Sequence, residues 1–374
     1  MADYLVNLGF EIRPTDPRTM AVVPPTHRVD ISRYVDLVEE VARLHNYNRI
    51  PCTMPSTNLV PDAPTPLESM TRGILDTMVS LGFNECRSYS FTSEEIARRM
   101  GHDPEGLPHV TNPLTVDQAV MRPTVLCGLL TAVSSNQRQD EPDIMLFELG
   151  KVWNEGAQAG DPAGERQELA IVLTGSTPLS WAEAQRPYDF YDLKGVVESL
   201  LASLSAAPVD FKRMSDSGVY HPGRTAAIHW LGMKVGEIGE LHPDMADFFD
   251  IKGRVYCARI EVSSTAEAAA EQKSAFRPIP RFPGSWRDLA LLVDKTVEAA
   301  SLLEIVRSAG GSLLEETNIF DLYEGKHVPE GKKSIALRMR LRSLEGTLTE
   351  DDITRTVEKI VKQLGKKAGA SLRS

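Results

Sequence analysis

Cysteine is scarce in this sequence, with four residues among 374, and no two of them are spaced as a CxxC pair. That scarcity argues against a disulfide framework or a cysteine zinc site and predicts a cytoplasmic protein, because reducing compartments disfavour disulfides. The sequence also lacks an apolar run long enough to span a bilayer, so we expect no membrane association. Its first residues do not combine a basic start with a long apolar stretch, which argues against a secretory signal.

Motifs for independent catalysis are missing as well. There is no Walker motif, and Gly232, Gly236 and Gly239 lack the strand–GxGxxG–helix setting of a dinucleotide site. No serine or cysteine lies in a recognisable nucleophile elbow. His221 and His242, each followed by a proline, leave an independent hydrolase as one alternative.

Charge is unevenly distributed along the chain. The whole sequence has a net charge of −11, yet residues 276–374 hold 17 Lys and Arg against 14 Asp and Glu, a net of +3. The preceding 275 residues therefore carry −14. An acidic body with a mildly basic end is typical of a protein that binds a polyanion at that end only.

The pattern of elements predicts a soluble α+β protein with several parts. These are a small acidic-helix module at 1–55, a mixed core at 56–262, a linker at 263–275 and a terminal domain at 276–374. Strands are predicted at 4–6 and 20–23 in the first module and at 85–91 in the core. The order β-α-β-β-α-β in the terminal domain is that of a ferredoxin-like fold.

A predicted helix in the first module carries acidic residues on one face. Asp36, Glu39 and Glu40 are spaced i, i+3, i+4, and Asp30 lies just before the helix. Carboxylate oxygens in this number suit a hard cation such as Mg2+, or a basic group of a partner. The alternative is a solvated helix face whose acidic residues complement the helix dipole, with Asp30 or Ser32 as an N-cap.

In the terminal domain an expected strand at 333–341 alternates apolar and basic residues. The basic residues in this pattern are Arg338, Arg340 and Arg342. A period of two places them on the face opposite the apolar side chains, where an open sheet could bind phosphates or stack on bases. Further basic candidates for binding tRNA are Lys332, Lys333 and Arg287. The alternative is that alternating arginine is ordinary on a half-exposed strand.

Nine short segments together carry a family resemblance. They are RVDI (28–31), DLVEEVAR (36–43), NRIP (48–51), MRPTVLCGLL (121–130), FELG (147–150), FPGSWRDLA (282–290), DLYEG (321–325), PEGKKS (329–334) and TLT (347–349). The first three resemble the B5 domain of bacterial phenylalanyl-tRNA synthetase β subunits, the next two the catalytic-like module, and the last four the C-terminal anticodon-binding domain. The match follows the family's domain order nearly from end to end.

The resemblance implies a role in an (αβ)2 heterotetramer that uses ATP to join phenylalanine to tRNA(Phe). It implies that the α subunit holds the aminoacylation site while the β subunit supports it and grips tRNA. It also implies that Asp30, Asp36, Glu39 and Glu40 bind Mg2+ shared with the α subunit. The implied fold is a class II synthetase-like antiparallel-sheet core between a B5-type module and a ferredoxin-like anticodon-binding domain.

The core departs from an active class II synthetase. The expected Arg-x-Glu is reduced to Phe147-Glu148 without its arginine, and the glycine-rich strand that ends in an ATP-binding arginine is missing. We therefore expect no catalytic residue in this chain. The family's preceding OB-type and editing domains are also absent, so we expect the C-terminal portion of a β subunit, without editing. A free-standing RNA-binding or regulatory module derived from the same fold is the alternative.

Overall fold

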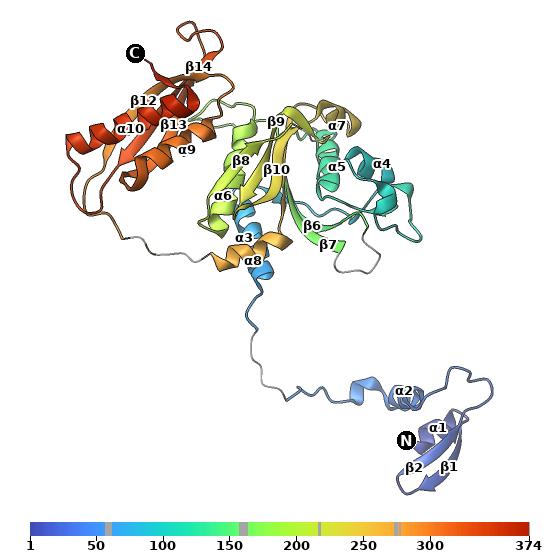
Figure 1. Cartoon of the computed structure of the whole chain (residues 1–374). Coiled ribbons are helices and arrows are strands. Elements are labelled where there is room, and N and C mark those ends of the chain that lie inside the picture. Colours follow the sequence, from blue (N-terminus) through green and yellow to red (C-terminus); the bar gives the residue numbers. More distant parts are fainter. Residues whose placement is uncertain (57–61, 157–163, 216–217, 273–275, 277, 374) are drawn as a thin grey trace. The chain divides into compact units, whose positions relative to one another are not determined.

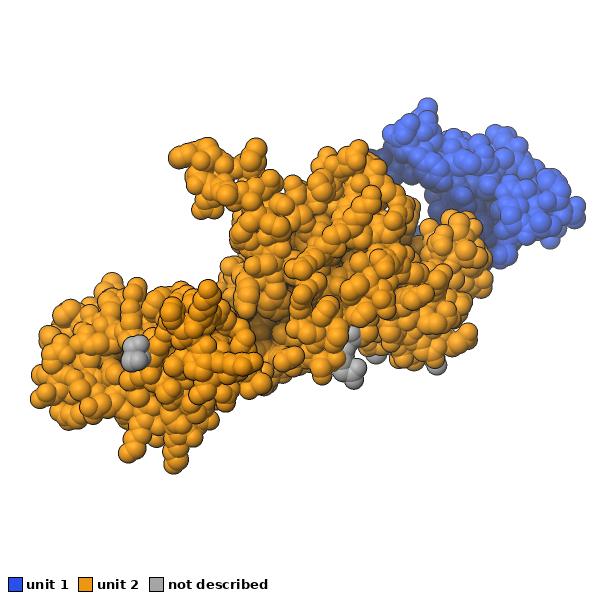
Figure 2. All heavy atoms as spheres, turned by 90° about the horizontal axis from the view of Figure 1, so that it is seen from above, with its two compact units in different colours: residues 1–76 blue, residues 77–374 orange. Residues whose placement is uncertain are grey.

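The structure, a computed structural model, describes residues 1–56, 62–156, 164–215, 218–272, 276 and 278–373. It divides into two compact units, Met1–Asp76 and Thr77–Ser374, which Figure 2 shows in different colours. The division falls inside helix α3 (Pro66–Ser80). Each unit is described by itself below. Residues 57–61, near the start of the expected core, and 273–275, in the expected linker, lie outside the described residues.

The N-terminal module consists of two helices, a two-stranded sheet and a 3-10 turn. Its elements are α1 (Ala2–Asn7), β1 (Glu11–Asp16), β2 (Thr19–Val23), α2 (Tyr34–His45) and η1 (Tyr47–Arg49). Strands β1 and β2 pair in antiparallel fashion. The predicted strand at 4–6 is wrong, because these residues lie in α1, which buries Leu5 and ends at a turn before Gly9. A three-residue apolar run cannot distinguish helix from strand.

The core of this module is small and unusual. Within residues 1–56 the buried side chains are Leu5, Phe10 and Glu40. Helix α2 therefore buries a carboxylate, while Tyr34 and Val38 on its surface are 78% and 58% exposed. The regularly spaced apolar residues of α2 thus do not form a buried face within the described residues.

The core module is built on one seven-stranded sheet. Its strands are β3 (Asn84–Glu85), β6 (Ile144–Trp153), β7 (Glu165–Thr174), β8 (Val209–Arg213), β9 (Tyr220–Trp230), β10 (Met233–Leu241) and β11 (Val255–Glu261). They lie in the order β3-β6-β7-β11-β10-β9-β8 and pair in antiparallel fashion, except for the short parallel contact between β3 and β6. An antiparallel sheet of this kind is what the class II-like expectation requires.

Helices cover both faces of this sheet (Figure 1). The further elements are α4 (Glu94–Arg99), η2 (Pro104–Gly106), η3 (Val116–Gln118), α5 (Leu126–Gln137), α6 (Phe190–Leu204) and α7 (Pro243–Phe248), together with a small sheet of β4 (Phe91–Thr92) and β5 (Val120–Met121). Helices α5 and α7 share one apolar cluster with alternate residues of the strands, including Val172 and Cys257. Helix α6, in which Leu193 and Val197 are buried, lies on the other face of the sheet.

Two predictions for the core need correction. The strand expected at 85–91 is two short strands, β3 and β4, because the chain leaves the large sheet after Cys86 donates its N–H to the carbonyl of Phe147. The linker expected from Ser263 begins with helix α8 (Ser263–Glu271). Thr265 and Ala266 of this helix are buried, so its alanine-rich composition reflects packing.

The terminal domain has the predicted β-α-β-β-α-β order. Its elements are β12 (Ser285–Asp294), α9 (Ala299–Gly310), η5 (Gly311–Leu313), β13 (Leu314–Tyr323), β14 (Lys332–Leu341), α10 (Glu350–Ala368) and β15 (Ser371–Leu372). The strands lie in the order β13-β14-β12-β15, and α9 and α10 contribute to a single core with them. The Thr349 side chain accepts the N–H of Asp352, and the Asp352 side chain accepts the N–H of Thr349, which forms a capping box at the start of α10.

Candidate functional site

Strand β14 has one buried and one open face. Leu337, Met339 and Leu341 are fully buried against the helices, and the arginines between them have the opposite phase. The pairing with β12 sets Arg338 beside Asp288 and Arg340 beside Trp286. The predicted alternation of β14 is thus present, and it places the arginines on the face away from the helical core.

Aromatic rings accompany the arginines of this open face. The Arg340 guanidinium lies 5.2 Å from the ring centre of Trp286, and that of Arg338 lies 5.0 Å from Phe320. A third pair, Arg373 and Tyr323, is 5.1 Å apart. Guanidinium–ring distances below about 6 Å are favourable cation–π contacts. We call these six residues the arginine–aromatic face.

The aromatic half of this face was not among the residues predicted from the sequence. Trp286 could have been found, since its phase in β12 is opposite to that of the buried Leu289 and Leu291. Phe320 could not, because β13 shifts its register between Ile319 and Asp321, and a bulge changes which face a residue occupies.

Carboxylates already pair with the arginines. Both oxygens of Asp288 accept hydrogen bonds from Arg338, at 2.8 and 2.7 Å, and this pairing lowers the pKa of Asp288. Glu315 lies 3.1 Å from Nε of Arg340 and 2.9 Å from Nε of Arg342. Arg342 also donates to the carbonyl of Phe282 and is only 11% exposed, so it contributes less surface than the other two.

The other basic candidates lie elsewhere. Arg287 has the phase of the buried residues of β12 and donates to both oxygens of Glu350 at the start of α10, so it does not join the three arginines. Lys332 and Lys333 begin β14 beside Asp294 and Val293. Six residues of extended strand, roughly 20 Å, separate Lys332 from Arg338. The tRNA-binding role of each remains a prediction.

Two of the four candidate carboxylates in the N-terminal module pair with one arginine. Nη2 of Arg28 lies 2.7 Å from Asp30 and 2.9 Å from Glu40, and Arg43 binds the second oxygen of Glu40 at 2.5 Å. Hydrogen bonds from Arg28 hold the pKa of Asp30 at about 2, and those from Arg28 and Arg43 lower the pKa of Glu40.

The remaining two carboxylates do not join that cluster. Asp36 accepts hydrogen bonds from the backbone N–H groups of Ser32 and Arg33, which lower its pKa and cap α2, while Glu39 is exposed. Among the described residues, no three His, Cys, Asp or Glu side chains are placed to hold a metal ion. The residues as arranged do not fit a divalent cation, because a guanidinium already neutralises two of the four.

Glu148, the glutamate of the incomplete Arg-x-Glu motif, forms a buried ion pair with Arg122. Arg122 and Glu148 are 3% and 4% exposed, and their Nη1 and Oε1 atoms are 2.7 Å apart. Ser88 donates to the other oxygen of Glu148, and Arg122 Nε donates to the carbonyl of Lys151. A Cβ on Gly150 would lie 2.1 Å from Nη2 of Arg122, so a side chain there would displace the guanidinium. These groups are occupied with each other inside the protein.

The two histidines have local structural roles. Nδ1 of His221 accepts the N–H of Gly223 at 3.1 Å, and Nδ1 of His242 accepts the N–H of Asp244 at 3.2 Å as the cap of α7. These contacts stabilise a turn and a helix start, and they do not support the hydrolase alternative.

Comparison with known proteins agrees with these three regions. The family model described as the phenylalanyl tRNA synthetase beta chain CLM domain matches residues 50–262. The tRNA synthetase B5 domain matches residues 1–47, and the ferredoxin-fold anticodon binding domain matches residues 280–373. The chain belongs to the phenylalanyl-tRNA synthetase β-chain family. The predicted family and α+β fold class are thereby confirmed.

Individual relatives named phenylalanine–tRNA ligase beta subunit align with nearly the whole chain. The phenylalanine–tRNA ligase beta subunit of Geobacter sulfurreducens is 40% identical over 98% of this chain, and that of Syntrophus aciditrophicus is 36% identical over all of it. These alignments cover 46% and 47% of the relatives, so the chain spans about half their length. As a β-chain family member it is related to a component of a ligase complex.

Solved structures add little to this assignment. A pyrrolysyl tRNA synthetase of Desulfitobacterium hafniense aligns with 54% of this chain and 64% of its own, with a TM-score of 0.41 and 13% identity. That likeness carries no argument about function. In the described part of the β chain, no helix is both long and apolar enough to cross a membrane.

Proposed function

We propose that this chain serves as the C-terminal part of a phenylalanine–tRNA ligase β subunit in the cytoplasm. In this role it binds tRNA(Phe) and supports, without catalysing, the ATP-dependent attachment of phenylalanine by an α subunit in an (αβ)2 complex. The observation that carries the tRNA-binding part is the arginine–aromatic face on an open sheet of a domain that matches the anticodon-binding model.

Stacking is the contact this face would offer to unpaired bases. Trp286 and Phe320 are 46% and 54% exposed, and each already has a guanidinium over its ring. A base stacked on an exposed aromatic ring contributes about 1–3 kcal/mol, and single-stranded loops are the parts of RNA whose bases are free to stack. This arrangement supports recognition of a loop rather than of a duplex.

The arginines would supply the phosphate contacts. Arg338 and Arg340 are 51% and 33% exposed in their side chains, and exposed ion pairs are weak enough for a phosphate to compete with the carboxylate. On binding, Asp288 and Glu315 would lose these partners, which makes the affinity lower than that of a face with free arginines. The paired carboxylates would also lower the affinity for polyanions that offer no base to stack on.

Burial of the Arg122–Glu148 pair supports a non-catalytic role for this chain. Arg122 and Glu148 bind each other inside the core, so neither is free to hold ATP. The α subunit would then contribute the reacting site. In this proposal the core module contributes by packing against the α subunit.

Magnesium binding by Asp30, Asp36, Glu39 and Glu40 remains a separate proposal. It requires the guanidinium of Arg28 to leave Asp30 and Glu40, since both are paired in the chain alone. Association with an α subunit could be compared with and without EDTA, using Glu39→Gln as the variant because Glu39 is exposed and caps nothing. Indifference of assembly to both changes would remove the metal from the proposal.

The deciding experiment purifies this chain with an α subunit from the same genome. A complex that charges tRNA with phenylalanine in the presence of ATP, while neither chain charges alone, would support the proposed role. Arg340→Ala should weaken tRNA binding by the complex and reduce its dependence on salt. Tight tRNA binding without any association with the α subunit would instead favour a free-standing RNA-binding module.

A further inference from the structure

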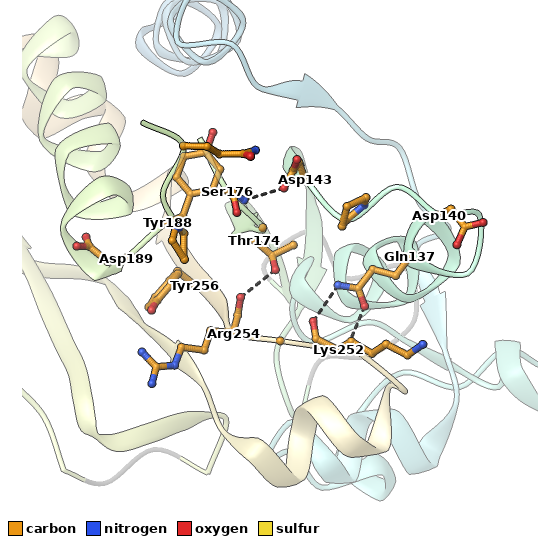
Figure 3. A pocket seen from close by; sticks show the side chains of 15 residues that line it. Gln137, Asp140, Asp143, Thr174, Ser176, Tyr188, Asp189, Lys252, Arg254 and Tyr256 are labelled. Atoms are coloured by element: carbon orange, nitrogen blue, oxygen red, sulfur yellow. Dashed lines mark hydrogen bonds between the residues drawn. The ribbon is translucent and has the colours of Figure 1, made fainter. Parts of the chain in front are cut away.

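Two places in this chain gather several charged side chains: a groove in the core module and the cluster around Arg28 in the N-terminal module. The groove, of about 880 Å³, is lined by three carboxylates and two cations, which Figure 3 shows. They are Asp140, Asp143, Asp189, Lys252 and Arg254. With charges of both signs on its walls, the groove favours no ligand of one sign. The cluster around Arg28 is a more specific arrangement.

Glu40 is the buried charge of the N-terminal module. It is 8% exposed and shares the small core of the module with Leu5 and Phe10. A buried carboxylate is stable only when a cation and hydrogen bonds replace the water that it has lost. Arg43 supplies one such contact from within α2, whereas Arg28 supplies another from the segment before the helix. The contact of Arg28 therefore joins α2 to a different part of the module.

The guanidinium of Arg28 lies where three segments of the module meet. Its Nη2 atom donates to Asp30 at 2.7 Å and to Glu40 at 2.9 Å, and its Nε atom donates to Asp30 at 3.0 Å. Its Cζ atom lies 5.7 Å from the ring centre of Phe10, which follows α1. The side chain is only 21% exposed. Arg28 thus connects the residue after α1, the turn at Asp30 and helix α2.

The contacts of this cluster are those of a guanidinium and not those of a divalent cation. Mg2+ holds oxygen ligands at about 2.0–2.1 Å in near-octahedral directions, whereas charge-assisted N–H···O bonds are about 2.7–2.9 Å long. Asp36 is held separately, by the N–H groups of Ser32 and Arg33 at 2.9 and 2.7 Å, and Glu39 is exposed. The arrangement therefore disagrees with the metal site that the family resemblance implies.

We propose that Arg28 is the resident cation of the N-terminal module and that it excludes a divalent cation from Asp30 and Glu40 in the chain by itself. The inference goes beyond the proposed function and does not depend on it, because it concerns the chain without α subunit or tRNA. Arg28 is a positioning residue in this role, since it holds the turn at Asp30 and the buried carboxylate of α2 in one arrangement.

Hydrogen exchange of the full chain tests this through the backbone amides of α2, residues 34–45. In the unmodified chain these amides should exchange equally fast in Mg2+ and in EDTA. Arg28→Gln should raise their exchange rate in EDTA about tenfold, because the variant loses the charge-assisted hydrogen bonds to Asp30 and Glu40. Mg2+ should slow the exchange of this variant, since one or two free carboxylates suffice to bind the ion.

Arg13→Gln is the matched control, because Arg13 pairs with Glu11 at 2.9 Å in the same module while both side chains are well exposed. It should leave the exchange of α2 unchanged in both solutions, as exposed pairs contribute little to stability. Arg28→Lys keeps the charge but lacks the planar fork that reaches two carboxylates. Its exchange rate should lie between those of the unmodified chain and Arg28→Gln, without a response to Mg2+.

The unmodified chain alone can overturn the proposal, through α2 amides that exchange faster in EDTA than in Mg2+. An Arg28→Gln variant that exchanges like the unmodified chain, or that ignores Mg2+, would overturn it as well. If Arg28→Gln does not fold, a response of Arg28→Lys to Mg2+ has the same meaning. The tRNA-charging assay of the complex is a separate measurement, so failure of this inference leaves the proposed function standing.

Discussion

The core module and the terminal domain each place an arginine–carboxylate pair on a sheet, with opposite consequences. Arg122 and Glu148 in the core are 3% and 4% exposed, whereas Arg338 and Asp288 in the terminal domain are 51% and 44% exposed. The closest N···O distance is 2.7 Å in both. The N···O distance alone would not distinguish the two ion pairs.

The degree of burial distinguishes the two ion pairs. A buried pair cannot exchange its partner for water or ligand, so removing one member leaves an uncompensated charge inside the protein. An exposed pair is nearly as stable apart as together, so its arginine remains available to a phosphate. The same chemistry therefore holds the core together in one region and can serve recognition in the other.

The largest effect is expected from breaking the buried pair. Arg122→Met should lower the free energy of unfolding by about 3–5 kcal/mol, because Glu148 would stay buried without its cation. Urea unfolding of the full chain, followed by core tryptophan fluorescence, measures this. Arg138→Met, which breaks an exposed pair with Asp250, is the control and should cost less than about 1 kcal/mol. Equal losses in the two variants would contradict the role assigned to burial.

A second buried carboxylate, Glu168, is hydrogen-bonded to uncharged groups and tests how burial affects a carboxylate pKa. Glu168 accepts hydrogen bonds from Thr124 and from the N–H of Val125, and burial raises its pKa above the ordinary value. The folded state then holds a proton that the unfolded state has lost, so this group's contribution to stability falls as pH rises from about 4.5 through the raised pKa. Glu168→Gln should remove that fall while leaving the acceptor in place. Parallel stability–pH curves for the two proteins would contradict the raised pKa.

In the terminal domain we expect a smaller effect, on the affinity for tRNA rather than on the free energy of unfolding. Trp286→Ala should weaken tRNA binding by about 1–3 kcal/mol through the loss of one stacking surface. A fluorescence-anisotropy titration with tRNA(Phe) measures this, and Trp181→Ala, an exposed tryptophan of the core, should leave the affinity of the free chain unchanged. If the two variants behaved alike, the arginine–aromatic face would not be the tRNA site.

The smallest effects on tRNA binding are expected from substitutions in the exposed Arg338–Asp288 pair. Arg338→Ala should lower the salt slope of tRNA binding by about 1, as expected for one lost phosphate contact. Asp288→Asn should act in the opposite direction and tighten binding at low salt, because it releases Arg338 from its carboxylate. Arg287→Ala, on the other face of the same sheet, should leave the slope unchanged. A lower slope in that variant would place the contact on the helical side.

Prediction from the sequence succeeded where a pattern repeats within one element. The alternation in β14 and the capping sequence before α10 identify strand and helix locally, since each depends on neighbours a few residues away. It was wrong for α1, whose apolar run is too short to show a period. The phase that Arg287 shares with Leu289 already indicated a face other than that of the three arginines, and its tRNA-binding role stays a prediction.

The sequence by itself determined the family, the order of the elements and the faces of the regular strands. Only the tertiary structure decided which charges meet: Arg122 with Glu148, Arg28 with Asp30 and Glu40, and Arg338 with Asp288. It also decided that Phe320 lies with Arg338. The physical reason is that periodic patterns depend on local backbone geometry, whereas most of these contacts join segments distant along the chain and depend on strand register, bulges and burial.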